Sequence, residues 1–205
     1  KVLDMYINYP VVVKEITAPC VVHEEKDFII RAFPLNHTKV CVGYTLEEKD
    51  RPGEFNPEKA KELNVPCGPL WSKLQNGETV EASDGTLVKP EDILGKPRKG
   101  RKFSYVTDTA YMDSIAQEVK NSDLLVCEGM FERALIDQAK EKKHMTSSQA
   151  AMIARDSNSK KMCLIHYSPR YTDKELGILE EEAKEIYPGT ILSKDRMRFE
   201  IPFED

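Results

Sequence analysis

Acidic and histidine side chains follow several of the β-type runs in this chain. Asp108 comes directly after the run 103–106, Glu128 closes the run 124–127, and His166 follows the run 162–165. Because the carboxyl ends of strands gather ligands and catalytic groups at one edge of an α/β sheet, we expect these side chains to converge. His37, which follows the run 28–35 in the same way, is a fourth candidate.

Aspartate, glutamate and histidine are side chains that hold zinc or manganese, and one aspartate carboxylate can bridge two ions. Such residues at one sheet edge would suit a metal site. Each position also has an ordinary structural explanation, because an Asp after a strand commonly caps a turn or helix, and a lone His commonly packs or lies at the surface. Residue type and spacing alone leave both interpretations open.

The composition is that of a folded protein. Hydrophobic residues make up 40% of the 205 residues, charged residues make up 32%, and the formal net charge is −5. This charge excludes a protein that coats nucleic acid through its overall charge, but it is compatible with a local basic patch. The length suits one substantial domain, with or without a projecting subdomain.

The five cysteines are scattered and form no CxxC pair. This pattern indicates neither a disulfide framework nor a zinc ribbon and is typical of a reducing compartment. No apolar run approaches the roughly 20 residues of a membrane span, and the opening KVLDMYINYP does not read as a signal peptide. We therefore expect a soluble, cytoplasmic protein with no membrane partner. The chain opens without Met in what reads as an ordered segment, so we expect a part of a longer protein.

The first hundred residues divide into two patterns. Short β-type runs at 11–13, 28–33 and 40–44 predict a small antiparallel meander. From residue 45 to 99, Pro and Gly recur every few positions, which predicts one short helix over 57–63 and a hairpin at Asp84-Gly85. Apolar residues are too sparse in this second segment for an independent core, so we expect it to project as an arm.

The remainder of the chain alternates strands with helices, which predicts an α/β layered domain. Helices are expected near 114–120, over 147–154 and over 173–186, the last with Thr172 or Asp173 as its cap. In addition to the runs that precede Asp108, Glu128 and His166, extended segments are expected at 190–192 and 199–201.

Four strings resemble motifs of the ribonuclease Z family in type, order and interval. They are VTDTA, CEGMF, KKHMTSSQAA and LIHYSPRY, and the family patterns read approximately SGDT, HEATF, HST-x-x-QAA and LTH-x-S-x-RY. The segment GYTLEEKDRPGEFNPEKAKELNVPCGPLWSKLQNGETV also resembles the flexible arm of that family. The resemblance covers nearly the whole chain, and the ordered set of motifs is specific although no single motif is.

The resemblance implies an α/β fold of the metallo-β-lactamase type, an αββα sandwich of which this chain would hold the carboxyl-terminal two-thirds. Residues 1–44 and 99–205 would form the core, and residues 45–98 would form a flexible arm that binds tRNA. The implied activity is that of a zinc-dependent endoribonuclease that cuts the 3′ trailer from precursor tRNA. The implied cofactor is two Zn²⁺ per complete site, or Mn²⁺ in their place, and the implied assembly is a homodimer.

Carried over to this sequence, the resemblance implies that His37, Asp108 and His166 are metal ligands, with Asp108 bridging both ions. His144 matches a histidine beside the scissile phosphate, and Glu128 matches its orienting partner. This division suits phosphodiester hydrolysis, because bridged ions lower the pKa of a water. A histidine held by a carboxylate can supply a proton or a positive charge to the leaving oxygen.

The sequence departs from the family pattern in two ways. The HxHxDH cluster that supplies most of the family's ligands is absent, and His23 lies in VVHEEKDF, which matches no motif and reads as surface. Three ligands for two ions are too few for tight binding, so the chain as given is expected to be inactive and at best weakly metal-binding. Elsewhere VTDT replaces SGDT and CEGM replaces HEAT, but the Asp and the Glu are retained.

Basic residues near the predicted arm and the predicted site are candidates for RNA contact. Arg170 lies four residues past His166, where a phosphate contact and a structural salt bridge are equally good explanations. A run of cations at the base of the arm is either a solvated surface or a set of phosphate contacts; it consists of Lys96, Arg98, Lys99, Arg101 and Lys102.

Two other functions stay open. A metallo-β-lactamase-fold phosphodiesterase with a small substrate would carry the same ligands, although a small substrate does not require a projecting arm. A non-catalytic RNA-binding or dimerisation subunit would lack the histidine cluster altogether. The upstream coding sequence discriminates between these functions, because an HxHxDH string supports the enzyme.

Overall fold

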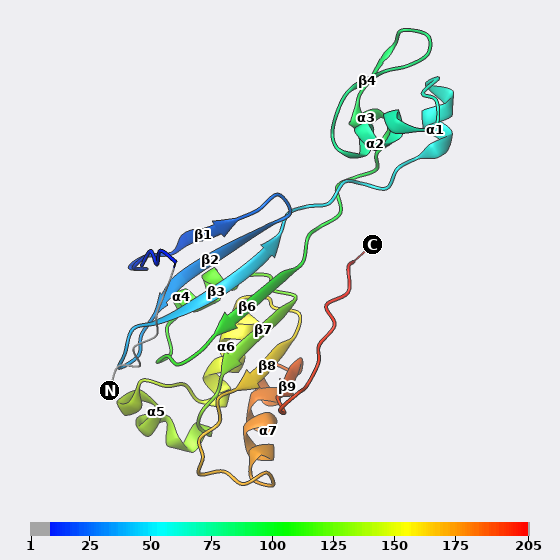
Figure 1. Cartoon of the computed structure of the whole chain (residues 1–205). Coiled ribbons are helices and arrows are strands. Elements are labelled where there is room, and N and C mark those ends of the chain that lie inside the picture. Colours follow the sequence, from blue (N-terminus) through cyan, green and yellow to red (C-terminus); the bar gives the residue numbers. More distant parts are fainter. Residues whose placement is uncertain (1–8, 205) are drawn as a thin grey trace.

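The computed structural model describes residues 9–204. A larger body built on a seven-stranded sheet carries a small lobe, which projects from it on two neighbouring segments (Figure 1). We expect the opening residues 1–8 to belong to an ordered segment and not to a signal peptide. They lie outside the described residues. Within residues 9–204, no helix is long and apolar enough to cross a membrane.

The sheet is mixed. Its first four strands pair antiparallel and its last four pair parallel, with one strand common to both halves. The parallel half brings the carboxyl ends of its four strands to one edge, as the alternation of strands and helices predicts. In spatial order the strands are β1 (Cys20–Glu24), β2 (Phe28–Leu35), β3 (Cys41–Glu48), β6 (Lys102–Val106), β7 (Leu124–Glu128), β8 (Met162–Ile165) and β9 (Thr190–Leu192).

Helices cover one face of this sheet. Alternate strand residues such as Val106, Leu125 and Leu164 lie in one buried core with Ile153 and Ala183 from the helices. Full burial of each such large side chain stabilises the fold by about 1.5–3 kcal/mol. The covering helices are α4 (Ser114–Glu118), α6 (Ser147–Asp156) and α7 (Leu176–Ile186), and a 3₁₀ turn (Arg133–Leu135) with α5 (Ile136–Lys142) forms the connection between β7 and α6.

The opposite face of the sheet is less covered. Tyr44 pairs with Tyr105 across β3 and β6, so both side chains point to the face away from the helices, as does Leu46, and each is 37–41% exposed. The described residues thus form one sheet with one helical layer, which is half of an αββα arrangement.

The small lobe contradicts the expectation that its apolar residues are too few for a core. It has three helices, α1 (Pro57–Glu62), α2 (Pro69–Gln75) and α3 (Pro90–Ile93), and a hairpin of β4 (Val80–Glu81) and β5 (Leu87–Val88) around the predicted turn. The prediction failed because Pro and Gly separate the apolar residues, so they follow no single period. The buried set is Ala60, Val65, Leu74, Val80, Ala82, Val88 and Ile93.

Several element boundaries also differ from the predictions. The run 11–13 is exposed coil, the strand β1 was not predicted, and 199–201 lies outside every strand. The helix α7 begins at Leu176 because Thr172 donates from its backbone and hydroxyl groups to Glu175, which forms a turn before the helix. The predicted start of the arm at residue 45 falls inside β3.

Candidate functional site

The three residues that follow parallel strands do lie at one edge of the sheet. Asp108 is in the loop after β6, Glu128 is the last residue of β7, and His166 directly follows β8. His37 joins them from the loop after β2, which is tied to the same edge because the backbone N–H of Asn36 donates to the Thr109 hydroxyl over 3.1 Å. Residues from four separate segments therefore meet.

Asp108 lies between two histidines. Its Oδ1 is 3.6 Å from Nε2 of His166, and its Oδ2 is 4.0 Å from Nε2 of His37. Burial opposes ionisation of this carboxyl group, but the Thr107 hydroxyl, which donates to Oδ1 over 2.8 Å, and the nearby imidazoles outweigh it. The pKa of Asp108 is therefore below its ordinary value, and at neutral pH the group is a carboxylate with one oxygen toward each ring.

The second nitrogen of His37 is held by the backbone. Nδ1 lies 3.0 Å from the carbonyl oxygen of Lys143, and only a protonated nitrogen can donate to a carbonyl. This contact assigns the proton of a neutral ring to Nδ1 and leaves the lone pair on Nε2, the atom that faces Asp108. A histidine fixed in this way has the tautomer that a metal ligand requires.

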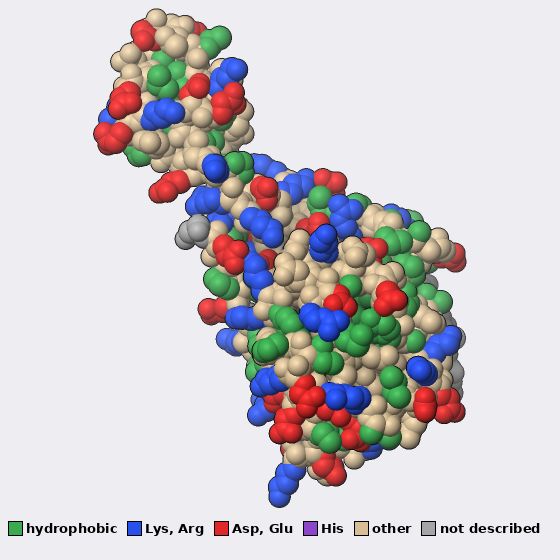
Figure 2. All heavy atoms as spheres, turned by 180° about the vertical axis from the view of Figure 1, so that it is seen from behind, with side chains coloured by type: hydrophobic (Ala, Val, Ile, Leu, Met, Phe, Trp, Pro, Cys, Tyr) green, Lys and Arg blue, Asp and Glu red, His purple; other side chains and the backbone are tan. Residues whose placement is uncertain are grey.

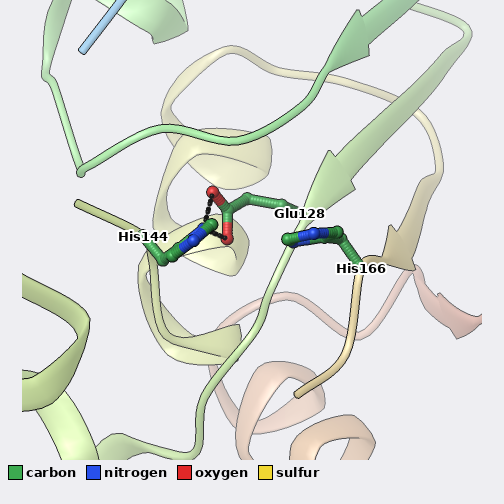
Figure 3. A group of neighbouring side chains, drawn as sticks. All are labelled: Glu128, His144 and His166. Carbon is green, nitrogen blue, oxygen red and sulfur yellow. Dashed lines mark hydrogen bonds and ion pairs between the residues drawn. The ribbon is translucent and has the colours of Figure 1, made fainter. Parts of the chain in front are cut away.

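Glu128 and His144 form a buried pair. Nδ1 of His144 lies 3.0 Å and 3.2 Å from the two carboxylate oxygens (Figure 3). Glu128 is fully buried and also accepts from the backbone N–H groups of Thr109 and Met145. The hydrogen bond to Glu128 raises the pKa of His144 above its ordinary value against the opposing effect of burial.

The elements around His144 fix its position. Lys143 ends α5 in a left-handed conformation, φ 55°, which turns the chain toward the site. Thr146 then caps α6 through a reciprocal pair of hydrogen bonds with Gln149. His144 is thus held between one helix end and the next helix start, and its ring lies 4.7 Å from that of His37 and 5.2 Å from that of His166, centroid to centroid.

His166 has an unusual backbone. Its φ of 60° is in the left-handed region, which a residue with a Cβ adopts at a cost and which clusters at functional sites. Potential ligand atoms of His166, His144 and Glu128 lie within 4.8 Å of one another. The lone pairs of Glu128 already accept from His144 and from two backbone N–H groups, so Glu128 is better suited to orient His144 than to bind an ion.

Sequence reasoning missed the groups that orient the site. The hydroxyl of Thr107, the backbone N–H of Thr109 and the carbonyl of Lys143 hold Asp108, Glu128 and His37 respectively. The hydroxyl of Thr107 precedes Asp108 in the string VTDTA and is therefore visible in the sequence. No sequence signal identifies the backbone N–H of Thr109 or the backbone carbonyl of Lys143 as an orienting group.

Arg170 lies close to this site without an acidic partner among the described residues. Its Nη2 donates to Gln138 over 3.0 Å and its Nε donates to Ser168 over 3.2 Å, so both partners are neutral. The guanidinium also lies 5.0 Å from the centre of the Phe131 ring, which forms a T-shaped pair with the ring of His144. Within residues 9–204, Arg170 therefore forms no salt bridge, which was one of the two explanations expected for it.

The structure divides the predicted run of cations. Arg101 forms an ion pair with Glu48 at 2.5 Å, and Lys102 forms one with Glu47 at 2.9 Å. Arg98 donates from Nε to the carbonyl of Pro52. Lys96 and Lys99 are exposed and form no ion pair within residues 9–204. Lys and Arg side chains gather where the two neighbouring segments join the lobe to the body (Figure 2).

Comparison with known proteins identifies the family. The profile described as "Beta-lactamase superfamily domain" matches residues 82–167. Ribonuclease Z of Treponema denticola is 62% identical over all 205 residues of this chain, which span 67% of that relative. The chain belongs to the ribonuclease Z family. Ribonuclease Z of Treponema pallidum (strain Nichols) is 56% identical and that of Borrelia garinii is 43% identical, and the chain spans 66% and 64% of their lengths.

Solved structures support the fold that ribonuclease Z membership implies. Human tRNase Z, short form (ELAC1), aligns with a TM-score of 0.53 at 20% identity, over 90% of this chain and 48% of that one. The metallo-β-lactamase fold protein YhfI of Bacillus subtilis aligns with a TM-score of 0.53 at 18% identity, over 89% and 52% of the two chains. The predicted α/β fold of metallo-β-lactamase type is confirmed, and the chain holds only part of it.

Proposed function

We propose that this chain carries the downstream part of a metal-dependent endoribonuclease site that removes the 3′ trailer from precursor tRNA. The observation that carries the proposal is the position of Asp108, whose two carboxylate oxygens face two different histidines beside the buried Glu128–His144 pair. Membership of the ribonuclease Z family supports the reaction and the substrate.

The donor set suits metal ions, which a metallo-β-lactamase fold implies. His37, Asp108 and His166 would hold them, because imidazole and carboxylate ligands suit zinc and also manganese. Separate oxygens of Asp108 facing separate imidazoles suit a carboxylate shared by two ions. Bound zinc would supply a hydroxide at neutral pH and neutralise charge on the phosphate. Three ligands do not complete two sites, so residues 1–205 alone are proposed to bind metal weakly and to be inactive.

The Glu128–His144 pair would handle the leaving group. His144 carries its proton more firmly than an ordinary histidine, because Glu128 holds Nδ1 and raises its pKa. This leaves Nε2 to donate a proton to the departing ribose oxygen, or to stabilise its charge. Because the raised pKa favours the charged imidazole, the pair would provide a general acid without using a metal bond.

Substrate binding would involve the lobe and the cations near the site. Lys96, Lys99 and Arg98 lie on the segments that join the lobe to the body, and Arg98 keeps donors that Pro52 does not use. Arg170 lies 5.0 Å from the centre of the Phe131 ring, which neighbours His144. Such residues suit contacts with successive phosphates of an RNA, which position a substrate without reading its sequence. We further propose the homodimer that the family resemblance implies, in which the lobe of one subunit holds tRNA for the other.

The decisive experiment uses the full-length gene product, a precursor tRNA with a 3′ trailer and a chromogenic phosphodiester. Cleavage at the trailer junction supports the proposal. Hydrolysis of the small diester without cleavage of the precursor would instead favour a small-molecule phosphodiesterase. RNA binding with neither activity, in metal-loaded protein, would favour a non-catalytic subunit.

A further inference from the structure

The lobe is joined to the body by a narrow two-stranded neck. Its strands are held by backbone hydrogen bonds from Glu48 to Arg101 and in both directions between Arg51 and Arg98, at 2.8–2.9 Å. At Gly100 the strands are so close that a Cβ would run into the carbonyl of Glu48. A two-stranded ribbon has little stability of its own, so the neck requires further contacts to fix the direction of the lobe.

Phe203 makes such contacts with both strands of the neck. The Arg51 guanidinium lies 3.4 Å from the centre of its ring and the Arg101 guanidinium lies 3.9 Å from it. Buried Nε and Nη2 of Arg51 have no hydrogen-bond partner among the described residues, so this cation depends on the aromatic ring and on the nearby charge of Glu48. Stacking of a guanidinium on an aromatic ring is favourable, and more so where water is excluded.

The segment that carries Phe203 is itself attached to the body. Nη1 of Arg101 donates to the carbonyl of Ile201 over 3.0 Å. Glu204 pairs with Lys160 at 2.6 Å, and Lys160 in turn pairs with Asp123 at 2.6 Å, in the connection that leads into β7. The ring is therefore fixed to the body on one side and stacked on the neck on the other.

We propose that Phe203 is a positioning residue that sets the direction of the lobe. It clamps Arg51 and Arg101, one from each strand of the neck, against a segment that is anchored on the sheet. This inference rests on the proposed function, because the direction of the lobe affects activity only if the lobe holds RNA. A lobe held in its binding direction before RNA arrives loses less conformational freedom on binding, which strengthens the complex.

The first test measures motion of the lobe without RNA. Trp71 is the single tryptophan and lies in the lobe, where Nε1 donates to Val65 and the ring packs 4.9 Å from Phe55. In the full-length protein, with any other tryptophan replaced by Phe, Phe203→Ala should add a fast component to the anisotropy decay of Trp71. Phe203→Tyr, which keeps the ring, and Met197→Ala, an exposed control on the same segment, should leave the decay unchanged. An unchanged decay in Phe203→Ala would overturn the proposal.

The second test connects that motion to substrate. Phe203→Ala should raise KM for precursor tRNA roughly 5- to 10-fold, as expected for the loss of two cation–π contacts, with the rate on a small phosphodiester unchanged. Phe203→Tyr should restore KM. A faster Trp71 decay with unaltered KM would overturn the positioning role. If the wild-type protein cleaves no precursor tRNA, the proposed function fails, and the anisotropy decay still decides whether Phe203 holds the lobe.

Discussion

At the scale of single residues, similar side chains in this site have different environments. Asp108 is half-buried between two imidazoles with both oxygens directed at them. Glu128 is fully buried and its oxygens accept from His144 and from backbone N–H groups. The first carboxylate is therefore suited to ions and the second to orienting a histidine, and each role can be tested by a single substitution.

His144→Ala should separate catalysis from metal binding. The ring of His144 lies beside the proposed ligands, but its Nδ1 is hydrogen-bonded to Glu128. The variant should therefore keep its metal content. Its rate of precursor cleavage should fall at least about 100-fold. Single-turnover rates and elemental analysis of the full-length protein measure the two effects. A normal rate would remove His144 from the mechanism.

Glu128→Gln should lower the pKa of His144. The carboxylate is the main reason that this pKa is raised, and an amide provides no negative charge. A raised pKa in the folded state adds stability at low pH that is lost as pH rises through it. The free energy of unfolding of wild type should therefore exceed that of the variant below about pH 6.5, and this difference should shrink as pH rises through the raised pKa of His144. NMR titration of the imidazole groups, in protein from which a chelator has removed the metal, measures the pKa of His144. Denaturant unfolding at several pH values measures the difference in stability. Equal titration in Glu128→Gln and wild type would refute it; Glu141→Gln, on the exposed side of α5, is the control.

At the scale of elements, helix ends determine where His144 lies. Thr146→Ala removes the reciprocal cap between Thr146 and Gln149 at the start of α6. It should reduce the free energy of unfolding by about 1 kcal/mol and slow cleavage, because His144 is only two residues away. Thr146→Ser keeps the hydroxyl and should behave as wild type in both assays. Loss in Thr146→Ser equal to that in Thr146→Ala would show that the cap is not the cause.

The lobe can be removed at its neck. The backbones of Arg51 and Arg98 are hydrogen-bonded to each other in both directions, so an Asn-Gly turn in place of residues 52–97 can close the gap as a hairpin. This deletion should weaken binding of precursor tRNA while hydrolysis of a small phosphodiester is spared. Equal loss of both activities would mean that the lobe is part of the catalytic core.

The sequence predicted those parts of the molecule that follow local rules. Strands that alternate with helices predicted the parallel half of the sheet, and its carboxyl edge correctly brought Asp108, Glu128 and His166 together. His144 follows a helix, so no strand-end rule could have placed it, and the family resemblance was the only signal. The core of the lobe and the contact of Phe203 with Arg51 were missed, because irregular or distant segments leave no periodic pattern.

At the scale of the whole molecule, one helix-covered sheet carries a site at its edge and a lobe on a narrow neck. The opposite sheet face exposes Tyr44, Leu46 and Tyr105, and the chain spans about two thirds of the length of the curated relatives. His37, Asp108 and His166 are the three proposed ligands of a proposed pair of ions. Catalysis is therefore expected of the full-length gene product and not of residues 1–205 alone.

The most direct test of this account is the metal content of Asp108→Ala in the full-length protein. If one carboxylate is shared by two ions, both metal and precursor cleavage should be lost together, while wild type and the exposed control Asp137→Ala should hold about two ions per site. Elemental analysis after gel filtration measures this without depending on activity. Full metal retention in Asp108→Ala would contradict the central claim.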